Sequence, residues 1–253
     1  MTHIKRNVLI ALTVFALGQG VAQAGAYDNI IAAVNNSDTE TVVDLIGRGM
    51  DVNTSDQTGT TLLMIAARNG NIPLMETLLA NRANANRRNR HGDTALLLAA
   101  LAGKLDVAQV LVKHRAEINP SGWTPLHYAT YGGHLDIAAF LIEYGANVDA
   151  RAPNGQTALM LAAKLGKIEL ARLLVEAAAE IDMVDYDKDT ALTLAVKSEN
   201  TAIVEYLRSR TAAEMVAPIE SLPQPAPTEG TPPPEDASAS ADAPTPGQTP
   251  LFD

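Results

Sequence analysis

Short apolar stretches alternate with polar turns along this chain, and they do so with a fixed period. Five six-residue phrases share a leading Thr, a mainly apolar middle and a closing Ala; they begin at Thr61, Thr94, Thr124, Thr157 and Thr190. Three of the four steps between them are 33 residues, and the step from Thr94 to Thr124 is 30. A fixed period of this size predicts stacked supersecondary units in place of one closed core.

Each unit is expected to contain two short helices. The leading Thr can cap a helix through its hydroxyl, and Pro125 directly after Thr124 suits the first helical position. In four units a glycine follows the first helix, where it accepts a positive φ and ends the helix; these are Gly70, Gly103, Gly133 and Gly166. A second apolar stretch then repeats near i, i+3 and i+4, which is the spacing of one buried face.

Two phrases in the third full unit resemble the ankyrin repeat. Residues 124–129 read Thr-Pro-Leu-His-Tyr-Ala, and residues 141–149 read Leu-Ile-Glu-Tyr-Gly-Ala-Asn-Val-Asp. The resemblance implies an all-α solenoid in which a short β-hairpin finger and two antiparallel helices form each unit. Residues 27–53 read as a degenerate capping unit. About six units are therefore expected, near 27–55, 56–88, 89–118, 119–151, 152–184 and 185–211.

Two departures from the repeat predict local changes. Arg82 and Arg115 stand where the family usually has a glycine after the second helix, so those turns are expected to be strained or reshaped. The 30-residue step removes three residues between Asn119 and Gly122, so the finger there is expected to be shorter.

The two ends of the chain differ in composition from the repeats. Residues 1–24 combine a basic start, an apolar run at 8–17 and Ala22-Gln-Ala24, as in a signal peptide cleaved after Ala24 or Ala26. The apolar run is too short to span a bilayer of about 30 Å, although an uncleaved anchor is the alternative. The repeat domain then occupies 25–211. Residues 212–253 are rich in Pro, Ala, Glu, Ser and Thr and predict a disordered acidic tail.

Charge and composition exclude several classes of function. The formal net charge is −10, and it becomes −12 once the signal peptide is removed. The tail carries seven acids and no Lys or Arg. Without a basic stripe, binding to nucleic acid is not expected. The chain has no cysteine, which excludes disulfides, thiolate metal sites and cysteine nucleophiles.

Candidate catalytic and metal-binding groups are explained by the repeat. The resemblance implies that His127 bonds the local backbone and the neighbouring Thr, and that His134 belongs at the start of a second helix. Asp185, Asp187 and Asp189 alternate as in a calcium loop, but the glycine and distal glutamate of such a loop are missing, which favours a solvated hairpin. No phosphate loop or nucleophile elbow occurs. No catalytic residue, metal or cofactor is predicted.

The resemblance also implies that variable positions at the finger tips and on the concave face contact a partner. In this chain they include Arg68, Asn69, Arg90, His91, Asp93, Trp123, Tyr131, Gln156, Lys164, Tyr186 and Asp187. Trp123 is the only tryptophan and stands in the shortened finger, and Trp, Tyr and Arg often anchor interfaces. The alternatives are that Trp123 packs against a neighbouring finger and that the basic run 87–91 is a solvated tip.

These features predict an exported, monomeric, non-enzymatic scaffold that binds another protein, with no membrane contact after signal cleavage. The signal peptide and the repeats together favour a bacterial periplasm, with secretion as the alternative. Proteins of similar layout include periplasmic ankyrin proteins thought to support an exported enzyme such as a catalase. Two other functions are alternatives: an immunity protein that neutralises a toxic effector, and a hydrolytic enzyme that uses surface carboxylates and His91.

Overall fold

The computed structural model describes residues 28–216 of the 253-residue chain, with side chains placed through residue 211. Regular structure in this part is helical, apart from one antiparallel bridge between Ser55 and Thr61. The signal peptide expected at 1–24 and most of the expected tail, residues 217–253, lie outside the described residues.

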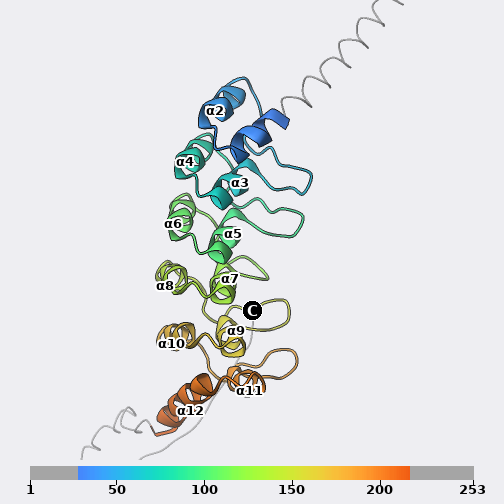
Figure 1. Cartoon of the computed structure of the whole chain (residues 1–253). Helices are drawn as coiled ribbons and strands as arrows, with labels where there is room; N and C mark the ends of the chain where they lie inside the picture. Colours follow the sequence, from blue (N-terminus) through green and yellow to red (C-terminus); the bar gives the residue numbers. More distant parts are fainter. Residues whose placement is uncertain (1–27, 217–253) are drawn as a thin grey trace, which may run out of the picture. The chain divides into compact units, whose positions relative to one another are not determined.

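The helices follow one another in pairs, as the period predicts (Figure 1). Residues 28–35 form the described part of the first helix. The others are α2 Thr39–Gly47, α3 Leu62–Asn69, α4 Ile72–Ala80, α5 Ala95–Ala102, α6 Leu105–Lys113, α7 Pro125–Gly132, α8 Leu135–Glu143, α9 Ala158–Leu165, α10 Ile168–Glu176, α11 Ala191–Lys197 and α12 Thr201–Val216.

The pairs stack in chain order into two rows. The inner row is α3, α5, α7, α9 and α11, each packed on the next, and the outer row contains α4, α6, α8 and α10. In Figure 1 the loops that precede the inner helices all project to the side away from the outer row. Fully buried alanines such as Ala66, Ala100 and Ala129 let neighbouring inner helices approach closely.

The predicted helix ends are confirmed. Each leading Thr is an N-cap whose hydroxyl accepts a hydrogen bond from the backbone N–H three residues later. The N–H of Met64 thus donates to Thr61, and that of Met160 to Thr157. The glycines that end α3, α5, α7 and α9 have φ between 70° and 81°. In the last unit Glu199, with φ of 58°, takes the place of the glycine.

A ladder of side chains between units sets their spacing. The Oδ1 atom of Asn53 accepts the N–H of Asn84 at 2.8 Å. Asn86, Asn119 and Asp149, which also follow outer helices, accept in the same way from the segment after the next outer helix, at 2.7 to 2.9 Å. Each of these bonds joins a side chain that follows one outer helix to the backbone that follows the next, so the ladder aligns successive helix pairs.

The turns at Arg82 and Arg115 are strained, as predicted. Their φ values are 69° and 63°, in the left-handed region, and Ala178 at the equivalent position has φ of 64°. A non-glycine residue costs roughly 1–2 kcal/mol in this conformation. Gly49 and Gly145 occupy the same place in two other units without that cost.

Arg82→Gly is therefore expected to raise the free energy of unfolding by about 1 kcal/mol, because glycine adopts this turn without steric strain. Urea denaturation followed by circular dichroism measures the change. Arg82→Ala is the control, since it removes the side chain but keeps the Cβ atom that causes the strain. An equal gain from both variants would show that side-chain crowding, not the backbone, limits this turn.

The boundary between repeats and tail requires a correction. The helix α12 runs to Val216, so residues 212–216, assigned above to a disordered tail, are helical. The earlier units stop their second helix with a left-handed residue, as at Arg82, Arg115 and Ala178, whereas the equivalent residue Thr211 lies within α12. The first proline after it is Pro218, and until then the residues are compatible with a helix.

Candidate functional site

Five loops, called fingers 1 to 5 below, precede the five inner helices and comprise residues 54–60, 87–93, 120–123, 150–156 and 183–189. Each long finger is closed by one backbone hydrogen bond between residues four apart, such as Asn89 N–H to Asp93 O at 3.0 Å and Ala152 N–H to Gln156 O at 2.9 Å. A second backbone hydrogen bond, between residues three apart, lies inside each long finger, as from Gly92 N–H to Asn89 O at 3.0 Å. Among the described fingers only finger 1 has a β-bridge, so the β-hairpins expected from the family are reduced here to tight turns. Finger 3 is too short for the bond between residues four apart.

The long fingers are coupled in two pairs. Arg90 N–H of finger 2 donates to Thr58 O of finger 1 at 2.9 Å, and Tyr186 N–H of finger 5 donates to Asn154 O of finger 4 at 3.3 Å. Gly59 and Gly155 lie at these contacts, where a side chain would meet the backbone of the next finger.

Finger 3 interrupts this array, which confirms the predicted shortening (Figure 1). A Cβ atom added at Gly92 of finger 2 would meet no atom within 4 Å. At Gly122 of finger 3 the nearest atom to such a Cβ would be Pro153 Cγ, at 3.8 Å. The space beside Gly92 of finger 2 therefore stays open. The equivalent space beside Gly59 and Gly155 is filled by the next finger.

Trp123 lies at the base of finger 3 and packs on its own unit. Its ring meets His127 edge to face with centroids 5.5 Å apart, and Tyr128 with centroids 6.3 Å apart. The ring is half-buried. His127 and Tyr128 both belong to α7. These ring contacts are therefore not contacts with a neighbouring finger, which was the alternative expected for Trp123.

Tyr128 links this aromatic group to finger 2. Its hydroxyl donates to Asp93 Oδ1 at 3.1 Å. Burial raises the pKa of Tyr128, and the negative charge of Asp93 raises it further. Asp93 also accepts from the amide of Asn89 at 3.3 Å, so this carboxylate is held by two neighbours.

His127 is buried and fully bonded, in the role that the repeat implies. Its Nε2 atom lies 3.1 Å from the carbonyl oxygen of Gln156 and so carries the proton, while Nδ1 accepts from the hydroxyl of Thr124 at 2.8 Å. Burial lowers the pKa of His127, against hydrogen bonds to the carbonyls of Gln156 and Ala150 that raise it. The ring is thus a neutral connection between the third full unit and the one that follows it.

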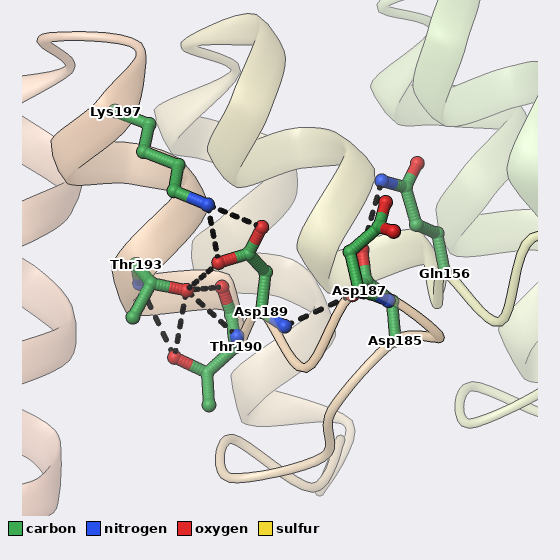
Figure 2. Close-up of polar contacts among 7 residues, drawn as sticks. All are labelled: Gln156, Asp185, Asp187, Asp189, Thr190, Thr193 and Lys197. Carbon is green, nitrogen blue, oxygen red and sulfur yellow. Dashed lines mark hydrogen bonds and ion pairs between the residues drawn. The ribbon is translucent and has the colours of Figure 1, made fainter.

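The prediction that Gln156 contacts a partner is corrected by the structure, because its side chain is buried and not available to a partner. It is only 7% exposed, and its Nε2 donates to Asp185 Oδ2 at 3.2 Å (Figure 2). The other oxygen of Asp185 accepts the backbone N–H groups of Asp187 and Asp189, at 3.0 and 2.9 Å. Asp185 is therefore a buried link between fingers 4 and 5.

The remaining acid at the base of finger 5 is also engaged. Asp189 forms an ion pair of 2.6 Å with Lys197 and accepts from Thr193 Oγ1 at 3.2 Å (Figure 2). The hydrogen bond from Lys197 lowers the pKa of Asp189. Nowhere in residues 28–211 do three His, Asp or Glu side chains gather in an arrangement that could hold a metal ion. Asp185 and Asp189 therefore stabilise the finger and its junction with α11, whereas the side chain of Asp187 is exposed.

The other expected contact residues divide by their surroundings. Side chains that are exposed belong to Arg68, Arg90, His91, Tyr131, Lys164, Tyr186 and Asp187, with Tyr186 at 71%. Asn69 is exposed but its amide donates to the carbonyls of Val34 and Asn35 at the end of the first helix. His134 caps α5 in a similar way, with Nε2 3.0 Å from Leu101 O.

Two exposed residues of the inner row escaped the sequence analysis. Leu101 on α5 and Leu165 on α9 are 38% and 37% exposed, and they flank Tyr131 on α7, which is 60% exposed. These helices pack side by side, so the three side chains lie on successive units of one row. The signal was present, because both leucines occupy the variable positions at the end of the first helix. They were passed over because apolar residues in a helix are usually assigned to the core.

None of the helices within residues 28–216 is long and apolar enough to cross a membrane.

In a comparison with protein-family models, one described as ankyrin repeats in three copies matches residues 30–120, 78–152 and 148–217, which together span more than half of the chain. A comparison with curated proteins returned no match.

Proposed function

Because the chain belongs to the ankyrin-repeat family, we propose that it is an exported scaffold which holds a partner protein against its fingers and inner helices. Ankyrin repeats indicate a protein-interaction scaffold, and proteins built from them are generally not enzymes. Stacked repeats present extended surfaces to which a partner can bind along several units.

The row of exposed apolar side chains on α5, α7 and α9 carries this proposal. Leu101, Tyr131 and Leu165 follow one another on neighbouring helices and face away from the core. Exposed apolar side chains that are scattered singly are ordinary on protein surfaces, whereas these three recur on successive units of one row, where one partner can contact them together. Tyrosine at its centre supplies a large contact area and a polar hydroxyl, as interface anchors do.

The proposed compartment is the bacterial periplasm, with secretion as the alternative. The support is the basic start, the apolar run and the small residues of the first 24 positions. The partner that we propose there is an exported enzyme, such as a catalase, that the scaffold supports. This choice rests on the layout of an exported ankyrin domain.

Photo-crosslinking in living cells tests the proposal. A crosslinkable residue at Tyr131 is expected to trap one partner protein, whereas the same residue at Tyr144 is not. Tyr144 is the matched control, because it is an exposed tyrosine of the same unit that stands at the end of α8 in the outer row. We further expect Tyr131→Ala to weaken capture of that partner by about tenfold, since truncating an interface anchor typically costs more than 1 kcal/mol.

The outcomes separate the candidate functions. An exported enzyme trapped at Tyr131 supports the proposal, and a toxic effector trapped there would replace it with the immunity function. No trapped protein at Tyr131, or equal trapping at Tyr131 and Tyr144, contradicts partner binding by the inner row.

A further inference from the structure

Charge is distributed unevenly along the stack. Residues 82–115 contain seven Lys or Arg and two Asp or Glu, whereas residues 176–189 contain six Asp or Glu and one Lys. Finger 2 lies in the basic stretch and finger 5 lies in the acidic one. A charge separation of this kind gives a charged partner a preferred orientation, because each end of the stack attracts groups of the opposite sign. At physiological ionic strength such attraction between exposed charges extends over about 8 Å.

The positive charge at the tip of finger 2 is not neutralised by the protein. Across residues 28–211 the ion pairs are Arg48–Asp44 and Lys197–Asp189, and neither belongs to finger 2. The side chains of Arg87 and Arg90 are exposed, and no described group forms a hydrogen bond with either guanidinium. Arg88 beside them donates to the carbonyl of Gly92 at 3.2 Å, which orders the tip.

Next to this tip the structure leaves an aromatic surface uncovered. Finger 3 is too short to reach Gly92, so the flank of finger 2 stays open. Trp123 stands at the base of finger 3, half-buried, and is linked to finger 2 through Tyr128 and Asp93. Asp93 is the one carboxylate in finger 2, and the hydroxyl of Tyr128 and the amide of Asn89 both donate to it.

We propose that finger 2 and the shortened finger 3 together bind an acidic, extended segment of the partner protein. The inference rests on the proposed function and specifies the chemistry of the partner. Carboxylates of the segment would pair with Arg87 and Arg90, whose planar guanidinium groups match them. An apolar or proline residue of the segment would lie on Trp123, whose position is fixed by its contacts with α7.

The same charges select against a long polyanion. The whole chain is acidic, and Asp187 stands exposed on finger 5, followed by the acids of its base. A nucleic acid or acidic glycan lying along the finger row would meet these groups after leaving finger 2. A peptide segment can confine its negative charge to the length of fingers 2 and 3, so a protein partner fits the pattern better.

The single tryptophan of the chain provides a direct measurement. Because Trp123 is the only tryptophan, any change in tryptophan fluorescence on titration reports on finger 3. The probes are three synthetic peptides of equal length that contain proline and leucine and carry Glu, Gln or Lys at the same positions. We expect the Glu peptide to change the fluorescence saturably and more weakly at higher salt, and the Gln and Lys peptides to have little effect.

A pair of charge-reversal variants locates the site. Arg87→Glu with Arg90→Glu is expected to weaken binding of the Glu peptide at least about tenfold, because attraction to two carboxylates becomes repulsion. Lys113→Glu with Arg115→Glu is the control, since it changes the net charge equally at the end of α6 in the outer row. Circular dichroism checks that both variants fold.

Three results would overturn the inference: an equal response to the three peptides, equal loss in both double variants, or a stronger response to heparin or an oligonucleotide. Crosslinking at Tyr131 keeps the proposed function separate. A partner that is still trapped there while the Glu peptide fails to bind leaves the scaffold intact and removes only the acidic-segment site.

Discussion

Gly155→Ala is expected to lower the free energy of unfolding by about 3 kcal/mol, the largest effect of a single methyl group in the described fingers. Gly155 has a φ of 81°, which costs an alanine roughly 1–2 kcal/mol. The added Cβ would also lie 2.9 Å from the backbone nitrogen of Tyr186 and 2.7 Å from its ring. The backbone of finger 5 cannot move away without losing its hydrogen bond to Asn154.

Gly92→Ala is the matched control for this prediction. Gly92 has a similar φ of 86° at the equivalent place in finger 2, but a Cβ there would meet no atom within 4 Å. We expect a loss of only about 1–2 kcal/mol, from the backbone alone. Urea denaturation of both variants measures the difference. Equal losses of about 1–2 kcal/mol would mean that finger 5 does not press on Gly155, whereas equal losses of about 3 kcal/mol would mean that the flank of finger 2 is not open.

The second large effect concerns pH. Since burial lowers the pKa of His127 in the folded state, an unfolded chain takes up a proton there at a higher pH than the folded one. The resulting stability is fully present above the unfolded pKa of about 6.5 and is lost as the pH falls toward the lowered folded pKa. Each pH unit in that window removes at most about 1.4 kcal/mol, so we expect a loss of up to roughly 2 kcal/mol by pH 5.

His127→Met is the variant that isolates this contribution. Met64 and Met160 occupy the same position in two other units, where the sulfur accepts the N–H of the capping Thr at 3.5 Å. The variant is expected to fold and to lose less stability than the parent between pH 7 and pH 5. Thermal unfolding at several pH values measures this, and parallel curves for the two proteins would show that other groups cause the acid sensitivity.

Much of the fold could be predicted because its causes are local. The hydroxyl of Thr157 caps α9 from three residues away, and Gly166 ends the same helix through its own φ of 70°. The strain at Arg82 could also be predicted, since only the identity of the residue in that turn was needed. The end of α12 was missed because the composition of the tail outweighed the good helix formers Ala212, Ala213, Glu214 and Met215.

The candidate site could be predicted only in part, because some residues at its variable positions are exposed and others form hydrogen bonds within the protein. Tyr131 and Gln156 both occupy variable positions of the repeat, yet the first is exposed and the second donates to Asp185 from the next unit. Arg88 and Arg90 are close neighbours in one finger tip, but only the guanidinium of Arg88 donates a hydrogen bond to the backbone. Repeat position alone does not distinguish these cases.

The sequence by itself determined the units, their order, the helix ends and the one shortened finger, because each depends on residues a few positions apart. The tertiary structure decided which side chains are free. Every unit packs on another about 33 residues away, so the surroundings of Gln156 and of Gly92 are set by atoms of that second unit. Three residues missing from finger 3 therefore change the surroundings of finger 2, whose own residues give no sign of it.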